Sequence, residues 1–238
     1  MAKNKSKKWN WRVIIGVILF VSLALSIVFT IVSMILAPEQ PLPEEPHRKV
    51  KGDYTLMLVQ CALGLVVMFL PSMLEKKLRL EIPNYIFVLY FIFLYCAIYL
   101  GEVRNYYYLV PHWDTILHTF SGAMLGALGF TLVDILNRNE RVPIRLSPFF
   151  VAFFAFCFAL AAGAVWEIYE FTFDGVLGLN MQKFALEDGT QLIGRAALTD
   201  TMKDLIVDAL GAIVLVVLGY IQLKQAQHKE KRKNQGQA

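Results

Sequence analysis

Six long apolar stretches, separated by short polar segments, dominate the chain. Each is long enough to cross a bilayer as a helix, for which about 17 to 25 residues suffice. The first has no charged residue between Val13 and Ala37, which is too long for the apolar part of a signal peptide and favours a retained helix. The pattern predicts an all-α, polytopic transmembrane bundle of about six helices. The predicted spans are 13–36, 54–71, 84–100, 115–136, 148–171 and 203–222.

Composition and length agree with this class. Of the 238 residues, 57% are hydrophobic, and the mean hydropathy is +0.51, which is too apolar for a typical soluble protein. The length predicts one integral membrane domain, with a basic N-terminal segment at 1–12, the bundle at 13–222 and a basic tail at 223–238. The lipid bilayer is therefore its expected partner.

Lysine and arginine are distributed unevenly between the predicted loops. If both termini are cytoplasmic, the inner segments 1–12, 72–83, 137–147 and 223–238 hold 16 of the 23 basic residues. Such an excess marks the cytoplasmic side of a membrane protein, so the sequence predicts that the N-terminus and the C-terminus are both inside. For the same reason the basic ends are expected to be membrane-surface anchors, and no nucleic-acid partner is expected.

Ionisable residues stand at helical spacing near the ends of three spans, and the predicted orientation places all three ends on the outer side. A charge at the centre of a membrane helix costs about 2.5 to 3.5 kcal/mol, so such residues usually face the bundle interior and mark function. The sequence therefore indicates a polar site at the outer end of the bundle. The residues are Asp114 and His118 in the fourth span, Glu167, Glu170 and Asp174 at the end of the fifth, and Asp200, Asp204 and Asp208 at the start of the sixth.

Small residues continue these polar faces toward the middle of the membrane. Gly122 lies four residues after His118 and starts a GxxxG pattern, and Gly211 lies three residues after Asp208. The fifth span has Gly163 in the corresponding place. Because small residues allow membrane helices to approach closely, the polar faces are predicted to point at one another.

So many carboxylates in one place repel one another, and three physical remedies exist: raised pKa values, basic partners or a bound cation. The basic residues nearby in sequence, Arg104, Arg195 and Lys203, are few. A divalent cation is the most direct remedy, and carboxylates with one histidine suit Mg, Mn, Fe or Zn, although no standard motif such as HExxH is present. The predicted metal-binding set is centred on His118, Glu167 and Asp204, with Asp114, Glu170, Asp200 and Asp208 in support.

The same acids also suit structural roles that need no cation. Asp114 and Asp200 suit helix N-caps, because a carboxylate there accepts free amide bonds and complements the helix dipole. Glu170 and Asp174 suit a solvated membrane boundary. The deeper residues suit either a functional site or an interhelical hydrogen-bond network without a ligand. Serine catalysis is not expected, because Ser121 lacks the base and the orienting acid of a catalytic triad.

The longest outer loop is predicted at about 173–199, between the fifth and sixth spans, and it mixes glycines with polar and apolar residues. A long loop beside a site can be a lid that closes over it. It can equally be a surface connection, and the sequence does not separate the two.

Four segments around the site carry a family likeness: His112-Trp-Asp-Thr-Ile-Leu-His118, Trp166-Glu-Ile-Tyr-Glu170, Gly178-Leu-Asn-Met-Gln182 and Asp200-Thr-Met-Lys-Asp204. They resemble the YjdF-like family of bacterial inner-membrane proteins over roughly residues 85–222. The resemblance implies a multi-pass protein of the bacterial plasma (inner) membrane and names no reaction. A weaker likeness to VanZ-type membrane proteins rests on the Asp-x-x-x-His helix start and the later Asp-rich helix with glycine, and it implies an envelope-related role.

Three functions follow from this pattern. The first is a membrane enzyme that uses a bound divalent cation on a lipid or cell-envelope substrate, by polarising a phosphoryl or carbonyl oxygen or by activating water. The second is a non-catalytic envelope scaffold or stress factor held together by a polar network. The third is a cation-coupled transporter, which the lack of an internal repeat and the apolar inner halves of the helices disfavour. Whether the protein is an enzyme stays open at this point.

Overall fold

A computed structural model describes residues 10–39, 49–78, 82–137, 146–186 and 189–235. The chain divides into two compact units, Met1–Trp113 and Asp114–Ala238. Within the described residues six helices are long and apolar enough to cross a membrane, which confirms the predicted all-α fold class and the number of spans. The cytoplasmic location of the termini and the single-domain organisation stay predictions. The basic residues before 10 and the predicted inner loop over 138–145 lie outside the described residues.

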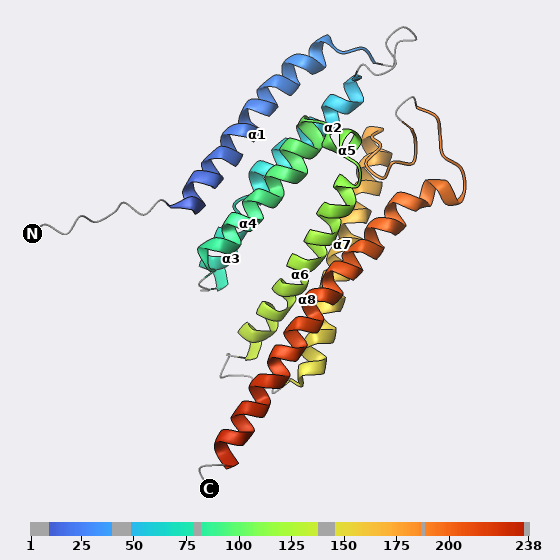
Figure 1. Ribbon diagram of the computed structural model, residues 1–238. Helices are drawn as coiled ribbons and strands as arrows, with labels where there is room; N and C mark the ends of the chain where they lie inside the picture. The colour runs from blue at the N-terminus through green and yellow to red at the C-terminus, as the bar shows by residue number, and fades with distance from the viewer. Residues whose placement is uncertain (1–9, 40–48, 79–81, 138–145, 187–188, 236–238) are drawn as a thin grey trace, which may run out of the picture. The chain divides into compact units, whose positions relative to one another are not determined.

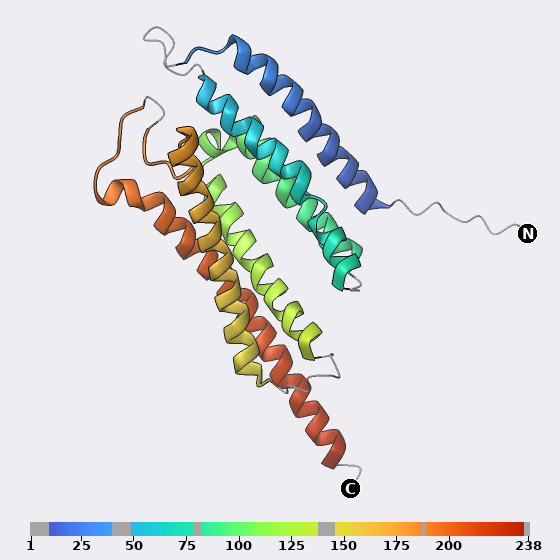
Figure 2. The same ribbon diagram turned by 180° about the vertical axis from the view of Figure 1, so that it is seen from behind.

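The first unit contains α1 (Trp11–Leu36), α2 (Lys51–Val67), α3 (Leu70–Leu78), α4 (Asn84–Leu94), the π-helix η1 (Tyr95–Val103) and α5 (Tyr106–Leu109). α1 packs against α2 and α4, and the three lie side by side in both ribbon views (Figures 1 and 2). Leu23 of α1, Cys61 of α2 and Phe87 of α4 are 0% exposed. The core of this unit therefore lies where these three helices meet.

Two predicted spans of the first unit are each built from two segments. α2 and α3 together form one candidate span, Lys51–Lys77, which is longer than the predicted 54–71. α4 continues directly into η1, so the next span reaches Val103. A π-helix is rare in proteins and usually short. The apolar pattern located both spans. Pro71 marks the break between α2 and α3, because it has no amide hydrogen to donate to the carbonyl of Val67, whereas the change from α4 to η1 carries no comparable sequence signal.

The second unit is built from three long helices, α6 (Trp113–Asn137), α7 (Pro148–Leu177) and α8 (Arg195–Gln235), which run side by side (Figures 1 and 2). The start of α6, the end of α7 and the start of α8 lie at the same end of this unit. α7 begins at an N-cap, Ser147, whose Oγ accepts a hydrogen bond of 3.2 Å from the amide of Phe150. It ends at Gly178, whose φ of +67° is the left-handed conformation that terminates many helices.

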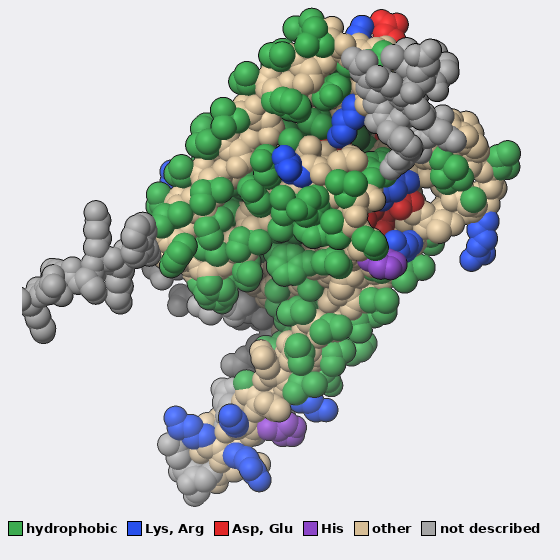
Figure 3. Space-filling view, turned by 45° about the horizontal axis from the view of Figure 1, so that its top comes forward, with side chains coloured by type: hydrophobic (Ala, Val, Ile, Leu, Met, Phe, Trp, Pro, Cys, Tyr) green, Lys and Arg blue, Asp and Glu red, His purple; other side chains and the backbone are tan. Residues whose placement is uncertain are grey.

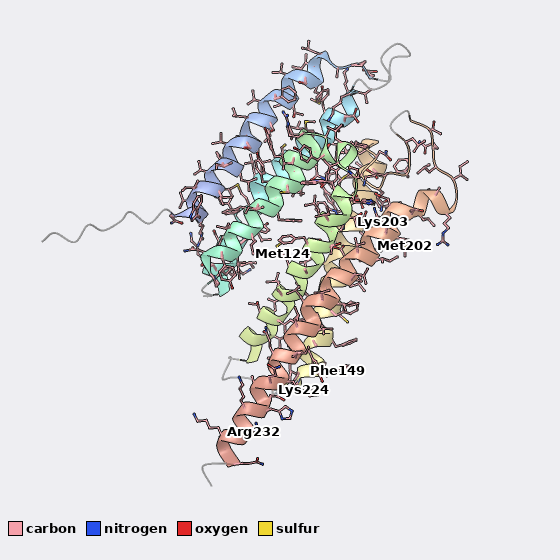
Figure 4. All side chains as sticks on the ribbon, viewed as in Figure 1. Met124, Phe149, Met202, Lys203, Lys224 and Arg232 are labelled. Carbon is pink, nitrogen blue, oxygen red and sulfur yellow. The ribbon has the colours of Figure 1, made fainter. Side chains whose placement is uncertain are left out.

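α8 is longer than the predicted 203–222 at both of its ends. Figure 4 labels Met202 and Lys203 near its start and Lys224 and Arg232 toward its far end. Because α8 begins at Arg195, its first acidic residue lies inside the helix rather than at its cap.

The N-cap interpretation is therefore wrong for Asp200. It is also wrong for Asp114, which lies in the first turn of α6 and not before it. In that first turn the carboxylate of Asp114 still complements the helix dipole.

Glycines let α6, α7 and α8 approach closely around Asp208. A Cβ atom on Gly122 of α6 would lie 2.2 Å from the backbone oxygen of Asp208, and a Cβ atom on Gly163 of α7 would lie 2.6 Å from its Oδ2. A Cβ atom on Gly211 of α8 would lie 2.0 Å from the backbone oxygen of Thr119. The three small-residue faces meet, which confirms the prediction that the polar faces next to them point at one another.

The surface and the interior of the second unit have the polarity expected in a membrane. Hydrophobic side chains cover much of the surface that Figure 3 shows, and the side chains of Phe149 and Phe171 on α7 are 70% and 69% exposed. In contrast, Glu167, Asp204 and Asp208 are only 5%, 2% and 2% exposed. Acidic residues therefore lie inside the unit and apolar residues outside it, which suits helices surrounded by lipid.

Candidate metal centre

Three potential metal ligands meet between the starts of α6 and α8. Asp114 and His118 lie one turn apart on α6, with Nε2 of His118 3.6 Å from Oδ1 of Asp114. Asp204 of α8 brings its Oδ2 to 4.0 Å from the same Nε2. One ligand atom from each of the three residues lies within 4.8 Å of the other two. This Asp–His–Asp cluster has the spacing to hold a metal ion.

Asp204 carries an oxygen atom that lacks a partner. Its side chain is 3% exposed, and Oδ1 is buried without a hydrogen bond from any residue that the structure describes. Leaving a buried acceptor unpaired costs about 1 to 3 kcal/mol, and more for a charged group. A cation that Oδ1 coordinates, together with ligand atoms of Asp114 and His118, would satisfy this oxygen.

The imidazole of His118 is fixed by a carboxylate on its other side. Nδ1 of His118 lies 3.3 Å from Oδ2 of Asp208, and Oγ of Ser121 donates a hydrogen bond of 2.8 Å to Oδ1 of the same aspartate. With the proton on Nδ1, His118 donates to Asp208 and leaves Nε2 as a lone-pair donor toward Asp114 and Asp204. Metal-binding histidines are oriented in this way in many proteins. The hydroxyl of Ser121 donates to the carboxylate and not to an imidazole, so these residues do not form a Ser–His–Asp triad.

A loop lysine reaches the acidic cluster from outside the helices. Nζ of Lys183 forms an ion pair with Oδ2 of Asp114, and it lies 3.2 Å and 3.3 Å from the two carboxylate oxygens of Asp200. Burial by itself lowers the pKa of Lys183, but the charges of Asp114 and Asp200 outweigh burial and raise this pKa above its ordinary value. The ammonium group is therefore a resident positive charge at the edge of the candidate metal centre.

The loop that carries Lys183 is anchored to the end of α7. Both carboxylate oxygens of Asp174 accept backbone hydrogen bonds, from Met181 at 2.7 Å and from Gln182 at 3.0 Å. Asn180 exchanges two hydrogen bonds with the backbone of Ala185, of 2.7 Å and 3.0 Å. These contacts fold the residues after α7 back toward α6 and α8.

Removing the Asp174 anchor is expected to open this loop. In Asp174→Ala the amides of Met181 and Gln182 lose a charged acceptor, which is worth about 2 kcal/mol and corresponds to a roughly 30-fold larger opening equilibrium. Hydrogen exchange of a peptide covering 178–186 should rise by this factor. Thr172→Ala is the matched control, because the Thr172 hydroxyl donates its hydrogen bond to the backbone of Ile168 in its own helix. Equal exchange in the two variants would contradict the anchoring role.

Glu167 lies beside the cluster and contacts the same loop. Its Oε2 is 3.3 Å from Nε2 of Gln182, which also donates a hydrogen bond of 2.8 Å to Oγ1 of Thr201 on α8. Its Oε1 is buried and has no partner among the described residues. Glu170 accepts a hydrogen bond of 2.8 Å from Nε1 of Trp166. The two glutamates are thus held by neutral donors.

The structure groups the predicted residues differently from the sequence. The cluster that can hold a metal contains Asp114, His118 and Asp204, and Glu167 as a ligand stays a prediction. A solvated boundary position is wrong for Glu170 and Asp174, which are 9% and 7% exposed. The predicted outer loop over 173–199 is shorter, since helix α7 continues to Leu177 and helix α8 begins at Arg195.

Two residues that contact the acids were not predicted from the sequence. The basic partner of the acids is Lys183, whereas proximity in sequence pointed to Arg104, Arg195 and Lys203. Gln182 belongs to a segment that carries the family likeness, and this is the only sequence signal for its position. Neither spacing nor hydropathy shows which loop residue turns inward.

The chain belongs to the DUF2238 family of predicted membrane proteins, whose model matches residues 17–225. An uncharacterized protein of Thermotoga maritima is 29% identical over 153 residues, which are 64% of this chain and 70% of that protein. No solved structure matches the chain. The membership confirms the expected class of multi-pass membrane protein, and the YjdF-like name and the inner-membrane location stay predictions. All residues of the candidate metal centre fall inside the matched region.

Proposed function

We propose that this protein is a divalent-cation-dependent membrane enzyme whose cation is bound by Asp114, His118 and Asp204. The observation that carries the proposal is the unpaired, buried Oδ1 of Asp204, on a carboxylate whose other oxygen lies 4.0 Å from Nε2 of the imidazole that Asp208 orients. A buried carboxylate oxygen without a donor fits a cation ligand better than it fits a finished hydrogen-bond network.

The donor set limits the identity of the cation. Two carboxylates and one imidazole suit Mg, Mn, Fe or Zn, and no thiolate takes part. Three protein ligands leave coordination positions for water or substrate, as in catalytic rather than structural metal sites. Such a cation would polarise a phosphoryl or carbonyl oxygen, or lower the pKa of a bound water molecule.

The position of the centre in the helices suggests the class of substrate. Asp114 is in the first turn of its helix and the cluster lies at the loop end of the second unit, so the centre would lie near head-group depth rather than at the middle of the bilayer. With the N-terminus inside, this end faces outward. Lipid head groups or cell-envelope precursors are the substrates that reach such a position.

A scaffold is the second candidate, and one observation favours it. Ser121 and His118 of α6 both contact Asp208 of α8, so a hydrogen-bond network already joins the two helices without a cation. If the protein needs only this network, its stability should not change when divalent cations are added or removed. A cation-coupled transporter is less well supported, because the stretches 119–133, 148–166 and 209–223 of α6, α7 and α8, beyond the cluster, contain no charged residue.

Binding of Mn²⁺ to the full-length protein in detergent tests the proposal. One equivalent is expected to bind, and free Mn²⁺ at 100 times its Kd should raise the free energy of unfolding by about 2.7 kcal/mol. Chelation should reverse the gain. The measurements are electron paramagnetic resonance of bound Mn²⁺ and thermal unfolding of the same sample.

Asp53→Asn is the matched control for nonspecific binding to carboxylates. Asp53 accepts a hydrogen bond from the backbone of Val50 at the start of α2, a role that asparagine can also fill, so this variant should bind Mn²⁺ as the parent does. Absence of saturable binding by Mn²⁺, Mg²⁺, Fe²⁺ and Zn²⁺ would refute the enzyme proposal and leave the scaffold.

A further inference from the structure

We propose that Lys183 is a tethered competitor for the cation, and that Asp200 is the residue that receives its ammonium group when the cation binds. The inference rests on the proposed function and adds a control element to the same centre. Lys183 and Asp200, which are not among the three proposed ligands, thereby receive roles at the centre.

The first step is the shared carboxylate. Asp114 offers one oxygen, Oδ1, toward His118, and its other oxygen, Oδ2, is paired with Lys183. An ammonium group and a divalent cation on one carboxylate repel each other strongly in a partly buried site. Binding of the cation at full strength therefore requires Lys183 to leave Asp114.

The second step is the place to which Lys183 can move. Asp200 lies one helical turn before Asp204 on α8, and its two oxygens are already 3.2 Å and 3.3 Å from Nζ of Lys183. The ammonium group of Lys183 therefore already contacts both oxygens of Asp200 while it is paired with Asp114. The ammonium group can thus give up Asp114 and keep a counter-charge.

The third step is the loop that holds the lysine. The backbone φ of Lys183 is +47°, a left-handed conformation that is uncommon for a residue with a side chain. It persists here because Asp174 and Asn180 fix the residues on both sides. A constrained backbone that aims one charged side chain at a ligand cluster is expected where the charge has a role in that cluster.

The test compares Mn²⁺ affinities of the full-length parent, Lys183→Met and Asp200→Asn in detergent. Without the competitor, Lys183→Met should bind Mn²⁺ about tenfold more tightly than the parent. Asp200→Asn should bind more weakly, because Lys183 then has only Asp114 as a counter-charge. Arg195→Gln is the matched control: it removes an exposed cation at the start of α8 and should leave the affinity unchanged.

The double variant separates the role of Asp200 from that of a direct ligand. In the Lys183→Met background, Asp200→Asn should lower the Mn²⁺ affinity much less than it does in the parent, whereas loss of a ligand would weaken binding equally in both backgrounds. An equal or lower affinity of Lys183→Met would overturn the inference and leave the proposed function standing. If neither the parent nor Lys183→Met binds Mn²⁺, Mg²⁺, Fe²⁺ or Zn²⁺, the proposed function itself fails.

A measurement on the unaltered protein covers the case in which Lys183→Met does not fold. An amine-reactive label should modify Lys183 several-fold faster in the presence of Mn²⁺, because the ammonium group is then released from Asp114. Mass spectrometry of the labelled peptide gives the rate, and Lys224, which is exposed toward the far end of α8, serves as the internal reference. A rate that falls or stays constant with bound Mn²⁺ contradicts the competition.

Discussion

Replacing Gly211 by alanine is expected to force α6 and α8 apart and to lower the free energy of unfolding by about 3 kcal/mol. The added Cβ atom would lie 2.0 Å from the backbone oxygen of Thr119 and 3.2 Å from the backbone nitrogen of Ala123. Both are main-chain atoms of a neighbouring helix, so no side chain can rotate to relieve the contact. Thermal unfolding in detergent and the monodisperse fraction after purification measure the effect.

The same substitution should also weaken the candidate metal centre. Gly211 follows Asp208 by one turn on α8, and Asp208 orients the imidazole of His118 on α6. A shift of the two helices by a fraction of an ångström would therefore separate the ligands that α6 and α8 contribute. Mn²⁺ affinity should fall together with stability in Gly211→Ala.

Gly175→Ala is the matched control for this prediction. Gly175 lies inside α7, and apart from its chain neighbours and the adjoining backbone of α7, no described atom would lie within 4 Å of its added Cβ. Alanine in a helix interior is favoured over glycine by about 0.5 to 1 kcal/mol, so this variant should be as stable as the parent or slightly more stable. Equal unfolding temperatures for Gly211→Ala and Gly175→Ala would show that α6 and α8 do not approach as closely as the structure places them.

Much of the helix packing could be predicted from the sequence because it depends on local periodicity. Gly122, Gly163 and Gly211 lie on the same helix faces as the acids, and 3.6 residues per turn is enough to show this. The neighbouring acids were therefore predicted correctly to point inward. The spacing does not show how far each helix is rotated about its own axis, or how far it is displaced along that axis relative to its neighbours.

These two quantities decide which acids share a cluster. Asp114 and Glu167 were both candidates to join His118 and Asp204, and the structure brings Asp114 into the group. Asp114 and His118 share α6, whereas the distance of Glu167 from the group depends on the rotation of α7 about its own axis. The contact of Lys183 with the cluster cannot be predicted from periodicity. Its position depends on a loop whose backbone is held by hydrogen bonds to Asp174 rather than by a repeat in the sequence.

Replacing His118 by alanine is expected to abolish measurable Mn²⁺ binding, with a loss of affinity of more than about 100-fold. The substitution removes the nitrogen ligand and leaves Asp114 and Asp204 as two carboxylates without the group between them. Asp208→Asn should have a smaller effect, of about 10- to 100-fold, because it weakens the orientation of the imidazole but keeps the ligand itself. The order of the two losses distinguishes a ligand from the residue that positions it.

His228→Ala provides the control, since it removes an exposed histidine from the far part of α8 and should bind Mn²⁺ as the parent does.

The side chain of Asp208 also accepts a hydrogen bond from Ser121. Ser121→Ala should therefore lower the affinity in the same direction as Asp208→Asn but by less, because the bond from Asp208 to Nδ1 of His118 remains. Full Mn²⁺ affinity in His118→Ala would contradict the assignment of the centre, whatever the behaviour of Asp208. If Asp208→Asn instead costs as much as His118→Ala, Asp208 is itself a ligand, as the sequence pattern predicts, and the cation lies on the Nδ1 side of the ring rather than beside Nε2.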